Sequence, residues 1–237
     1  KNLEIIFMNN KSLKCCNNEE GEVFQYAFSK IDMLEVIESY LIKNKKIKKI
    51  IISDVDCLFI KVNKLINYAS HIRSIAAINY RNELFTDDRF DDLIKECIDN
   101  SINLNKKSSK SISINKMAWI NSGFMIINRE LAINFSEYSR KTYLWFEKNK
   151  ERVKKICSNH YSDELIFSTI FNFVKGVEID NRKSNIARLI WTCHTAKITQ
   201  NTFNPINAPA HLHIPSIKWE NKHLIIISFL FKKPLIS

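Results

Sequence analysis

Residues 50–60 read Ile50-Ile51-Ile52-Ser53-Asp54-Val55-Asp56-Cys57-Leu58-Phe59-Ile60, an apolar run that ends in two carboxylates. An unbroken apolar, β-branched run is typical of a strand buried on both faces, as in a parallel sheet. Such a strand presents its acidic residues at its carboxyl end, where open α/β sheets bind ligands. Two carboxylates around a turn can hold a hard divalent cation that also binds a diphosphate. The stretch therefore predicts a metal and phosphate site in an α/β protein.

Length and composition agree with a folded α/β domain. The chain has 237 residues, of which 45% are hydrophobic and 26% are charged. That length is sufficient to bury a large core. Only 3 glycines and 4 prolines occur, and neither a GxGxxG nor a Walker-type sequence is found. Phosphate is therefore expected to be held by a metal ion and side chains, not by a glycine-rich loop.

The formal net charge of +11 permits anionic partners. The lysine-rich runs 43–49 and 106–110 contain no interleaved aromatic residues. Runs of this kind favour solvated loops or helix ends over a nucleic-acid or membrane surface. A nucleic-acid partner is therefore not expected.

The six cysteines form no CxxC pair, so neither a zinc site nor a dense disulfide framework is predicted. Cys57 and Cys97 lie in apolar patterns and are expected to be small core residues. No signal peptide opens the sequence. These features favour a reducing, cytoplasmic location.

The first half of the chain predicts a strand, helix, strand unit. Residues 3–8 favour a strand, and apolar residues recur at helical spacing from Ser29 to Leu41, which places Lys30 at a helix start. After the acidic strand, a short helix is expected at 62–69 and a strand at 74–78. The polar segment 79–115 predicts a long irregular insert.

The second half continues the alternation. A turn leads into a strand within 119–128, and one or two helices follow in 130–156. A buried helix is predicted at 165–171, and Ser162 is a suitable N-cap for it. Further strands are expected at 176–179, 187–191 and 210–214. The apolar run 224–231 is too short to span a bilayer, which needs about 20 residues; it is expected to close the core or to contact a membrane surface.

Four separated motifs carry polar side chains that one site could use. They are Asp54-x-Asp56, Asn121-Ser122-Gly123, Asp163-Glu164, and His213 with Lys218. Each motif is weak by itself, because a lone DxD or a lone strand histidine is common. Their order along the chain makes a shared site the stronger interpretation.

In this order the motifs resemble those of nucleotide-sugar glycosyltransferases of the GT-A fold. The resemblance is strongest to glycosyltransferase family 8, the group of glycogenin and the bacterial lipopolysaccharide galactosyltransferases. It covers residues 30–219 and implies an α/β protein of GT-A type. The implied architecture is a doubly wound, mainly parallel sheet flanked by helices. It forms a single domain over residues 1–219, followed by an apolar and basic C-terminal extension over residues 220–237.

By position, the resemblance implies that Asp54 and Asp56 hold Mn²⁺ or Mg²⁺ and that His213 is the third ligand. His213 is preferred to His211 because it leads directly into the next turn. Lys218 would neutralise the donor diphosphate. A mixed shell of carboxylate and imidazole suits Mn²⁺ better than Ca²⁺.

The remaining implied roles concern the donor. Lys30 corresponds to a basic residue that reaches the donor. Asp54 would also bind the donor. Asn121 and Ser122 would contact the donor sugar. Asp163 would bind sugar hydroxyls, and Glu164 stands where the family often has glutamine near the anomeric carbon. Asp163 and Glu164 are therefore the expected catalytic pair.

The resemblance also implies partners and a stereochemical outcome. The donor would be a nucleotide-diphosphate sugar, above all a UDP-sugar. The acceptor would be a saccharide or a lipid-linked saccharide, and the anomeric configuration would be retained. The basic, apolar end of the chain would allow peripheral contact with the inner face of a membrane.

This sequence departs from the family pattern at two places. The segment 211–219 lacks the family's glycine and the proline before Trp219. The chain before Asp54 is shorter than the family's nucleotide-binding portion. Either an amino-terminal strand is therefore expected to be missing, or the uridine pocket is expected to be unusual.

Two alternatives remain. The stretch around Asp54 and Asp56 also resembles the first motif of haloacid-dehalogenase phosphatases, in which the first aspartate is the nucleophile. Leu58 does not match that motif. The other alternative is a catalytically inactive domain of GT-A type that binds a nucleotide, a glycan or a partner.

Overall fold

A computed structural model describes residues 22–54, 57–80, 89–102, 117–157, 163–180, 185–189 and 210–213. Within these ranges the backbone alone is described for residues 22–28, 58, 157, 188–189 and 211–213. The predicted strand at 3–8 and the C-terminal extension lie outside the described residues. So do Ser162, Asp56 and Lys218.

The larger sheet is a mixed, four-stranded one with the order β1-β4-β3-β5. These strands are β1 (Lys49–Ser53), β4 (Ile120–Asn128), β3 (Ile75–Asn79) and β5 (Val177–Asp180). Strand β4 runs antiparallel to both of its neighbours, and only β3 and β5 pair in parallel. The prediction of a mainly parallel sheet is therefore not confirmed by the described strands. Apolar runs alone do not reveal that β4 is reversed.

Strands β3 and β4, not β1, are the buried strands of this sheet. All residues of β4 from Ile120 to Ile127 are buried, because neighbouring strands cover both of its edges and α5 and α7 pack against it. In β1 only Ile52 is buried, and Ile51 remains 37% exposed. The prediction that residues 50–52 form a doubly buried strand is wrong, since β1 lies at the end of the described strand order.

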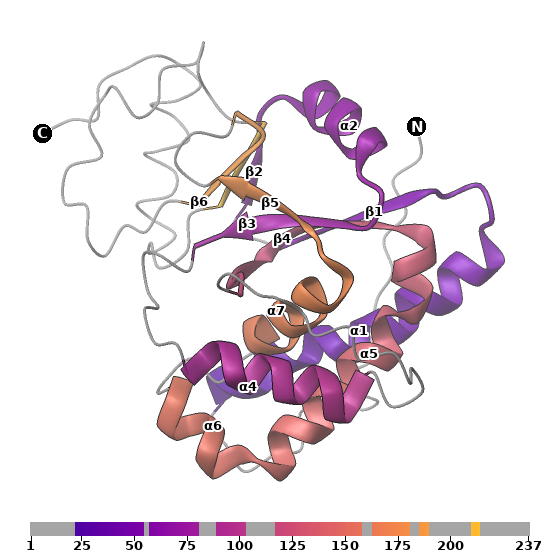
Figure 1. The fold of residues 1–237 in the computed structure, drawn as a ribbon. Helices are drawn as coiled ribbons and strands as arrows, with labels where there is room; N and C mark the ends of the chain where they lie inside the picture. Colours follow the sequence, from indigo (N-terminus) through magenta and orange to yellow (C-terminus); the bar gives the residue numbers. More distant parts are fainter. Residues whose placement is uncertain are drawn as a thin grey trace, which may run out of the picture.

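Helices cover both faces of the sheet. Figure 1 shows α1, α5 and α7 against one side of the sheet, α4 and α6 beyond them, and α2 on the opposite side. The helices are α1 (Glu22–Lys43), α2 (Val62–His71), α4 (Arg89–Cys97), α5 (Arg129–Lys148), α6 (Lys150–Cys157) and α7 (Asp163–Val174). Strands with helices on both faces define a three-layer α/β architecture.

The layer of α5 and α7 is held by aromatic contacts. Phe135 stacks on Phe167 with ring centroids 5.5 Å apart, and Tyr138 meets Phe173 edge to face at 5.6 Å. Phe135 and Phe146 are fully buried. Leu131, Phe135, Tyr143 and Phe146, which recur at helical spacing in the predicted helical segment 130–156, are therefore core residues. Burial of such rings contributes about 1.5–3 kcal/mol each.

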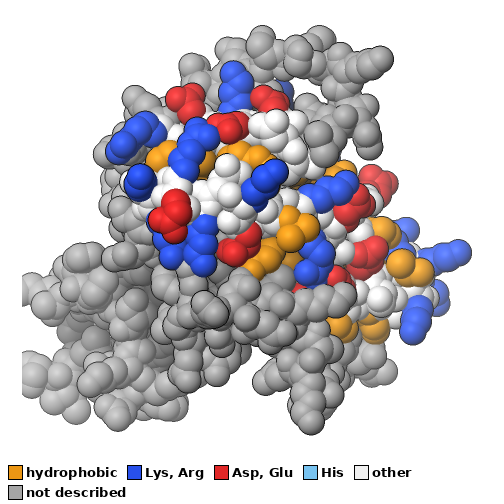
Figure 2. Space-filling model, turned by 90° about the horizontal axis from the view of Figure 1, so that it is seen from below, with side chains coloured by type: hydrophobic (Ala, Val, Ile, Leu, Met, Phe, Trp, Pro, Cys, Tyr) orange, Lys and Arg blue, Asp and Glu red, His pale blue; other side chains and the backbone are white. Residues whose placement is uncertain are grey.

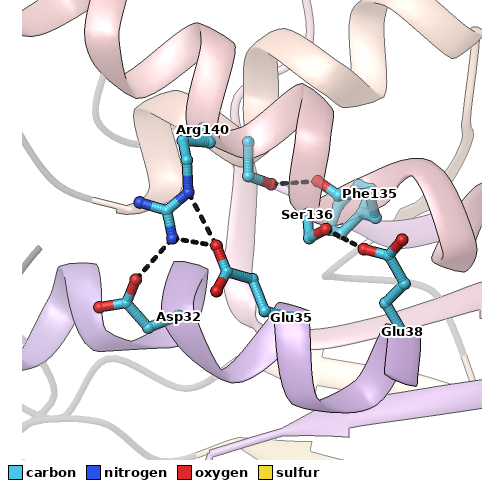
Figure 3. Close-up of polar contacts among 7 residues, drawn as sticks. Asp32, Glu35, Glu38, Phe135, Ser136 and Arg140 are labelled. Atoms are coloured by element: carbon cyan, nitrogen blue, oxygen red, sulfur yellow. Dashed lines mark hydrogen bonds and ion pairs between the residues drawn. The ribbon is translucent and has the colours of Figure 1, made fainter. Parts of the chain in front are cut away.

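Helix α1 is fixed to α5 by polar contacts between the two helices (Figure 3). Arg140 of α5 donates to Asp32 at 2.7 Å and to Glu35 at 2.5–2.9 Å. One turn earlier on α5, the hydroxyl of Ser136 donates to Glu38. These contacts fix the position of α1, and therefore of Lys30, relative to the rest of the fold.

A second, three-stranded sheet continues from the end of β1. Its order is β2 (Cys57–Phe59), β7 (His211–His213) and β6 (Ala187–Leu189). Strand β2 pairs antiparallel with β7, so that Cys57 lies opposite His213 and Phe59 opposite His211. The predicted strands around 187–191 and 210–214 are thus present over part of their ranges.

The segment 79–115 is not a continuous irregular insert. It contains α4 and a π-helical turn, η3 (Ile98–Ile102). Helix α4 buries Phe90, Leu93, Ile94 and Cys97 at helical spacing. The acidic residues at 87–92 obscured this pattern in the sequence, because only one face of the helix is apolar.

The described surface does not form a uniform basic patch on the face shown in Figure 2. Lysine and arginine side chains lie among aspartate and glutamate side chains there. Within the described ranges, no helix combines the length and the apolar character that crossing a bilayer requires.

Candidate active site

Lys30 lies at the centre of the candidate site. Its Nζ is 2.8 Å from Oδ1 of Asp54 and 3.0 Å from Oδ2 of Asp163. It also donates to the hydroxyl of Ser122 at 3.2 Å. Lys30 was predicted at a helix start, but α1 begins at Glu22, so Lys30 lies within the helix. A lysine inside a packed helix is held more firmly than one at a frayed helix end.

Asp54 is positioned by backbone hydrogen bonds at the end of β1. Its backbone N–H donates to the carbonyl of Gly123 at 3.0 Å, and its own carbonyl accepts from Cys57 N–H at 3.3 Å. The first bond extends the β1–β4 pairing by one residue. Asp54 therefore faces Lys30 from the end of β1, next to the Asn121-Ser122-Gly123 motif, which lies within strand β4 and not in a turn before it.

Asp163 and Glu164 form the first turn of α7. Carboxylates are favourable there because the unpaired N–H groups give the helix N-terminus a partial positive charge. Asp163 is only 4% exposed, and its ion pair with Lys30 compensates for its burial. Burial alone would lower the pKa of Lys30, but the charges of Asp163 and Asp54, with their hydrogen bonds, raise it above its ordinary value.

Glu164 accepts hydrogen bonds on both carboxylate oxygens. Tyr80 donates to Oε2, and Nδ2 of Asn121 donates to Oε1 at 2.8 Å. Burial and the nearby charge of Asp163 raise the pKa of Glu164 to about 7. The bond from Tyr80, the charge of Lys30 and a backbone hydrogen bond from Ser122 oppose that rise.

Tyr80 and Trp119 also belong to the site, although the sequence did not point to them. The indole N–H of Trp119 donates to the hydroxyl of Tyr80 at 2.5 Å. Burial, followed by the charge of Glu164, raises the pKa of Tyr80 well above its ordinary value. Two signals could have found these residues: Tyr80 directly follows β3, and Trp119 lies two residues before Asn121.

The structure brings six of the predicted residues into two linked groups. Lys30 joins Asp54, Ser122 and Asp163, while Glu164 joins Asn121. Asp163 and Glu164 connect the groups as neighbours on α7. Four sequence regions therefore meet at one place.

The predicted metal set lies only partly within the described residues. Asp56, Lys218 and the side chain of His213 are outside them. The backbone of His213 lies opposite Cys57, the residue after Asp56, whereas His211 lies two positions farther along β2. Among the described side chains, no three of His, Cys, Asp and Glu form a group suited to a metal ion.

Comparisons with known proteins give fold-level likenesses only. No protein-family model and no curated protein matches the sequence. Mouse xyloside xylosyltransferase 1 is similar over 83% of this chain and 67% of its own, with 14% identity and a TM-score of 0.42. The galactosyltransferase LgtC, solved with donor and acceptor sugar analogues, is similar over 80% and 59%, with 14% identity and a TM-score of 0.44. At these scores neither likeness assigns an activity to this chain.

Proposed function

We propose that this chain is a metal-dependent glycosyltransferase that moves a sugar from a nucleotide-diphosphate donor, above all a UDP-sugar, to a saccharide or lipid-linked acceptor. The observation that carries the proposal is the contact of Lys30 with Asp54, Ser122 and Asp163. These residues come from the motifs whose order resembles that of family 8, and the motifs are far apart in sequence. Chance motif matches would not be expected to converge on one lysine.

The charges at this place suit a diphosphate leaving group. Transfer breaks the bond between the anomeric carbon and a phosphate oxygen, and forms a bond from that carbon to an acceptor oxygen. Negative charge develops on the departing diphosphate, and a cation fixed beside it lowers the barrier. Lys30 is a half-buried, protonated cation held between two carboxylates, so it can bind donor oxygens without having to become charged first.

The residues of the predicted metal set suit a divalent ion in type. Asp54 lies at the end of β1, and the backbone of His213 lies opposite Cys57 at the start of β2. Carboxylate and imidazole together are suitable ligands for Mn²⁺ or Mg²⁺. A bound ion would supply Lewis-acid stabilisation of the diphosphate. Lys218 would add a further positive charge.

Asn121, Ser122 and Asp163 would orient the donor sugar. They lie on the buried strand β4 and on the first turn of α7. Rigid elements position polar groups more accurately than loops do. Retention at the anomeric carbon, a cytoplasmic location and contact with a membrane surface are further parts of the proposal, and they rest on the sequence resemblance and the basic, apolar C-terminus.

The proposal is tested by substituting Asp56 and measuring turnover of a nucleotide-sugar donor. Asp56→Ala is expected to lower Mn²⁺-dependent release of UDP from a UDP-sugar by about 100-fold or more. Asp92→Ala is a suitable control, because Asp92 is an exposed residue on the first turn of α4. Equal turnover in the two variants would overturn the metal assignment.

The alternatives predict different outcomes in the same assay. A binding domain without activity would bind UDP-sugar with Mn²⁺, measured by calorimetry, but would release no UDP. A phosphatase of the haloacid-dehalogenase type would hydrolyse a phosphate ester and would be inhibited by beryllium fluoride at Asp54.

A further inference from the structure

A chain of hydrogen bonds joins four side chains behind the proposed sugar site. Trp119 donates to Tyr80, Tyr80 donates to Glu164, and Asn121 also donates to Glu164. The residues come from the end of β3, the start of β4 and the first turn of α7. Trp119, Tyr80 and Asn121 are each at most 3% exposed, so the chain is part of the packed interior.

The direction of each bond is fixed by the chemistry of its groups. An indole N–H can only donate, so the Tyr80 oxygen accepts from Trp119 and its own hydrogen is directed to Glu164. An ionised carboxylate can only accept, so the amide nitrogen of Asn121, not its oxygen, must face Glu164. Glu164 therefore determines which end of the Asn121 amide points away from it.

Both oxygens of Glu164 are occupied by this arrangement. The carboxylate cannot rotate toward a bound sugar without breaking a bond to Tyr80 or to Asn121. Breaking one would leave a buried polar group unsatisfied, which costs about 1–3 kcal/mol. The geometry thus suits Glu164 to hold a neighbour in place and not to attack a substrate.

We propose that Tyr80 is a positioning residue of this enzyme. With Trp119 it fixes Glu164, and Glu164 fixes the amide of Asn121 for contact with the donor sugar. This inference rests on the proposed function and deepens it. It assigns Glu164 an indirect role, in which no covalent bond forms between its carboxylate and the sugar.

The first experiment compares Tyr80→Phe with Tyr138→Phe. Tyr138 lies on α5 and packs against Phe173, which is at the opposite end of α7 from Glu164. It serves as the control for loss of a phenol oxygen. Misplacement of a sugar-orienting group by about 1 Å can cost about 100-fold, so Tyr80→Phe is expected to lower kcat about 10- to 100-fold with little change in KM. Tyr138→Phe is expected to retain wild-type kinetics.

The pH profile separates positioning from simple structural damage. Among the described residues, the titratable groups that act on Glu164 include Tyr80 from the end of β3, Asp163 on α7 and Lys30 on α1. The bond from Tyr80 favours the ionised carboxylate, so its loss raises the pKa of Glu164. The acidic limb of kcat/KM should therefore move to higher pH in Tyr80→Phe. A loss that is equal at every pH would contradict the inference.

The second experiment is a double-mutant cycle that does not depend on Tyr80. In Glu164→Gln, the one remaining oxygen accepts from the Tyr80 hydroxyl. The new amide nitrogen would therefore face the Asn121 nitrogen, and two donors would oppose each other. Asn121→Asp in the same chain restores a donor facing an acceptor. The double variant is expected to be at least about fivefold more active than Glu164→Gln alone.

The outcomes distinguish failure of the positioning role from failure of the proposed function. Rescue in the double variant supports positioning, whereas a double variant no more active than Glu164→Gln would overturn it and favour direct chemistry at Glu164. If wild-type protein is active and Tyr80→Phe matches Tyr138→Phe, the inference fails while the proposed function stands. If wild-type protein turns over no UDP-sugar, both fail.

Discussion

Helix α1 takes part in two clusters, each of which joins one cation to two carboxylates. Arg140 reaches Asp32 and Glu35, which lie three residues apart on α1. Lys30 of α1 itself reaches Asp54 and Asp163, which lie on different elements. The first cluster connects two helices, and the second connects a helix, the end of a strand and a second helix.

The clusters are similar in exposure but differ in the number of carboxyl groups nearby. Each has one buried carboxylate, Asp32 with 5% and Asp163 with 6% side-chain exposure, and one that is more exposed, Glu35 with 44% and Asp54 with 30%. The Lys30 cluster also adjoins Glu164, so three carboxyl groups lie near one lysine. Removal of a cation from beside a buried carboxylate is costly, and at Lys30 it affects a third carboxyl group as well. Ion pairing by itself does not distinguish a structural cluster from a site.

The largest effect is expected from Lys30→Met, with Arg140→Met as its counterpart. Removal of Lys30 leaves Asp163 buried beside Asp54 and Glu164 without their nearest cation. Donor turnover should fall about 100-fold or more, and the free energy of unfolding should fall by about 3 kcal/mol. Steady-state kinetics and urea denaturation measure the two losses.

The variant Lys30→Met/Asp163→Asn serves as the control for charge. It removes both partners and should recover part of the lost stability without recovering activity. Wild-type turnover in Lys30→Met would mean that both clusters are structural, and the distinction between them would disappear.

A smaller effect concerns the dependence of stability on pH. The pKa of Glu164 is raised from 4.5 to about 7 in the folded protein, so the folded state binds a proton more tightly than the unfolded state. The contribution of Glu164 to the free energy of unfolding is fully present below about pH 4.5 and is lost as the pH rises through about 7. Urea denaturation at pH 5 and pH 8 measures how far the free energy of unfolding falls between these pH values. The fall should be larger for wild type than for Glu164→Gln, and an equal fall in both proteins would exclude this contribution.

The smallest effect on turnover is expected from Arg140→Met. The pair with Glu35 is exposed and contributes about 0.2–1 kcal/mol, whereas Asp32 is buried and loses more when its partner is removed. The free energy of unfolding should therefore fall by about 1–3 kcal/mol. Donor turnover should stay within about twofold of wild type, because Asp32 and Glu35 are not among the candidate site residues. A loss of turnover as large as that of Lys30→Met would show that the position of α1 controls the site.

Much of the local structure follows from the sequence. The periodicity of Leu131, Phe135 and Phe146 predicted a helix, and these residues are buried in α5. The strand at 74–78 was predicted within one residue of β3. Helix α4 was missed because charged residues occupy most of its exposed face. The sequence did not reveal that β4 runs antiparallel to its neighbours, because an apolar run does not specify the direction of a strand.

The site was predictable in residue type but not in arrangement. Asp54, Asn121, Asp163 and Glu164 were marked by motifs, because short polar motifs beside apolar runs are visible in one dimension. Tyr80 and Trp119 were not, since an aromatic residue beside a strand reads as core. The pairing of β3 with β4, together with the packing of α7 against β4, places Tyr80 near Glu164, 84 residues away along the chain.

The sequence of residues 50–60 was sufficient to predict a strand followed by acidic residues. Local propensity and hydrophobicity act over a few residues, so the sequence could specify that much. The tertiary structure decided that β1 is half exposed, that β3 and β4 are the buried strands, and that Lys30 faces Asp54. Those outcomes depend on which distant segments pack together, and the free energy of such packing is not contained in any single segment.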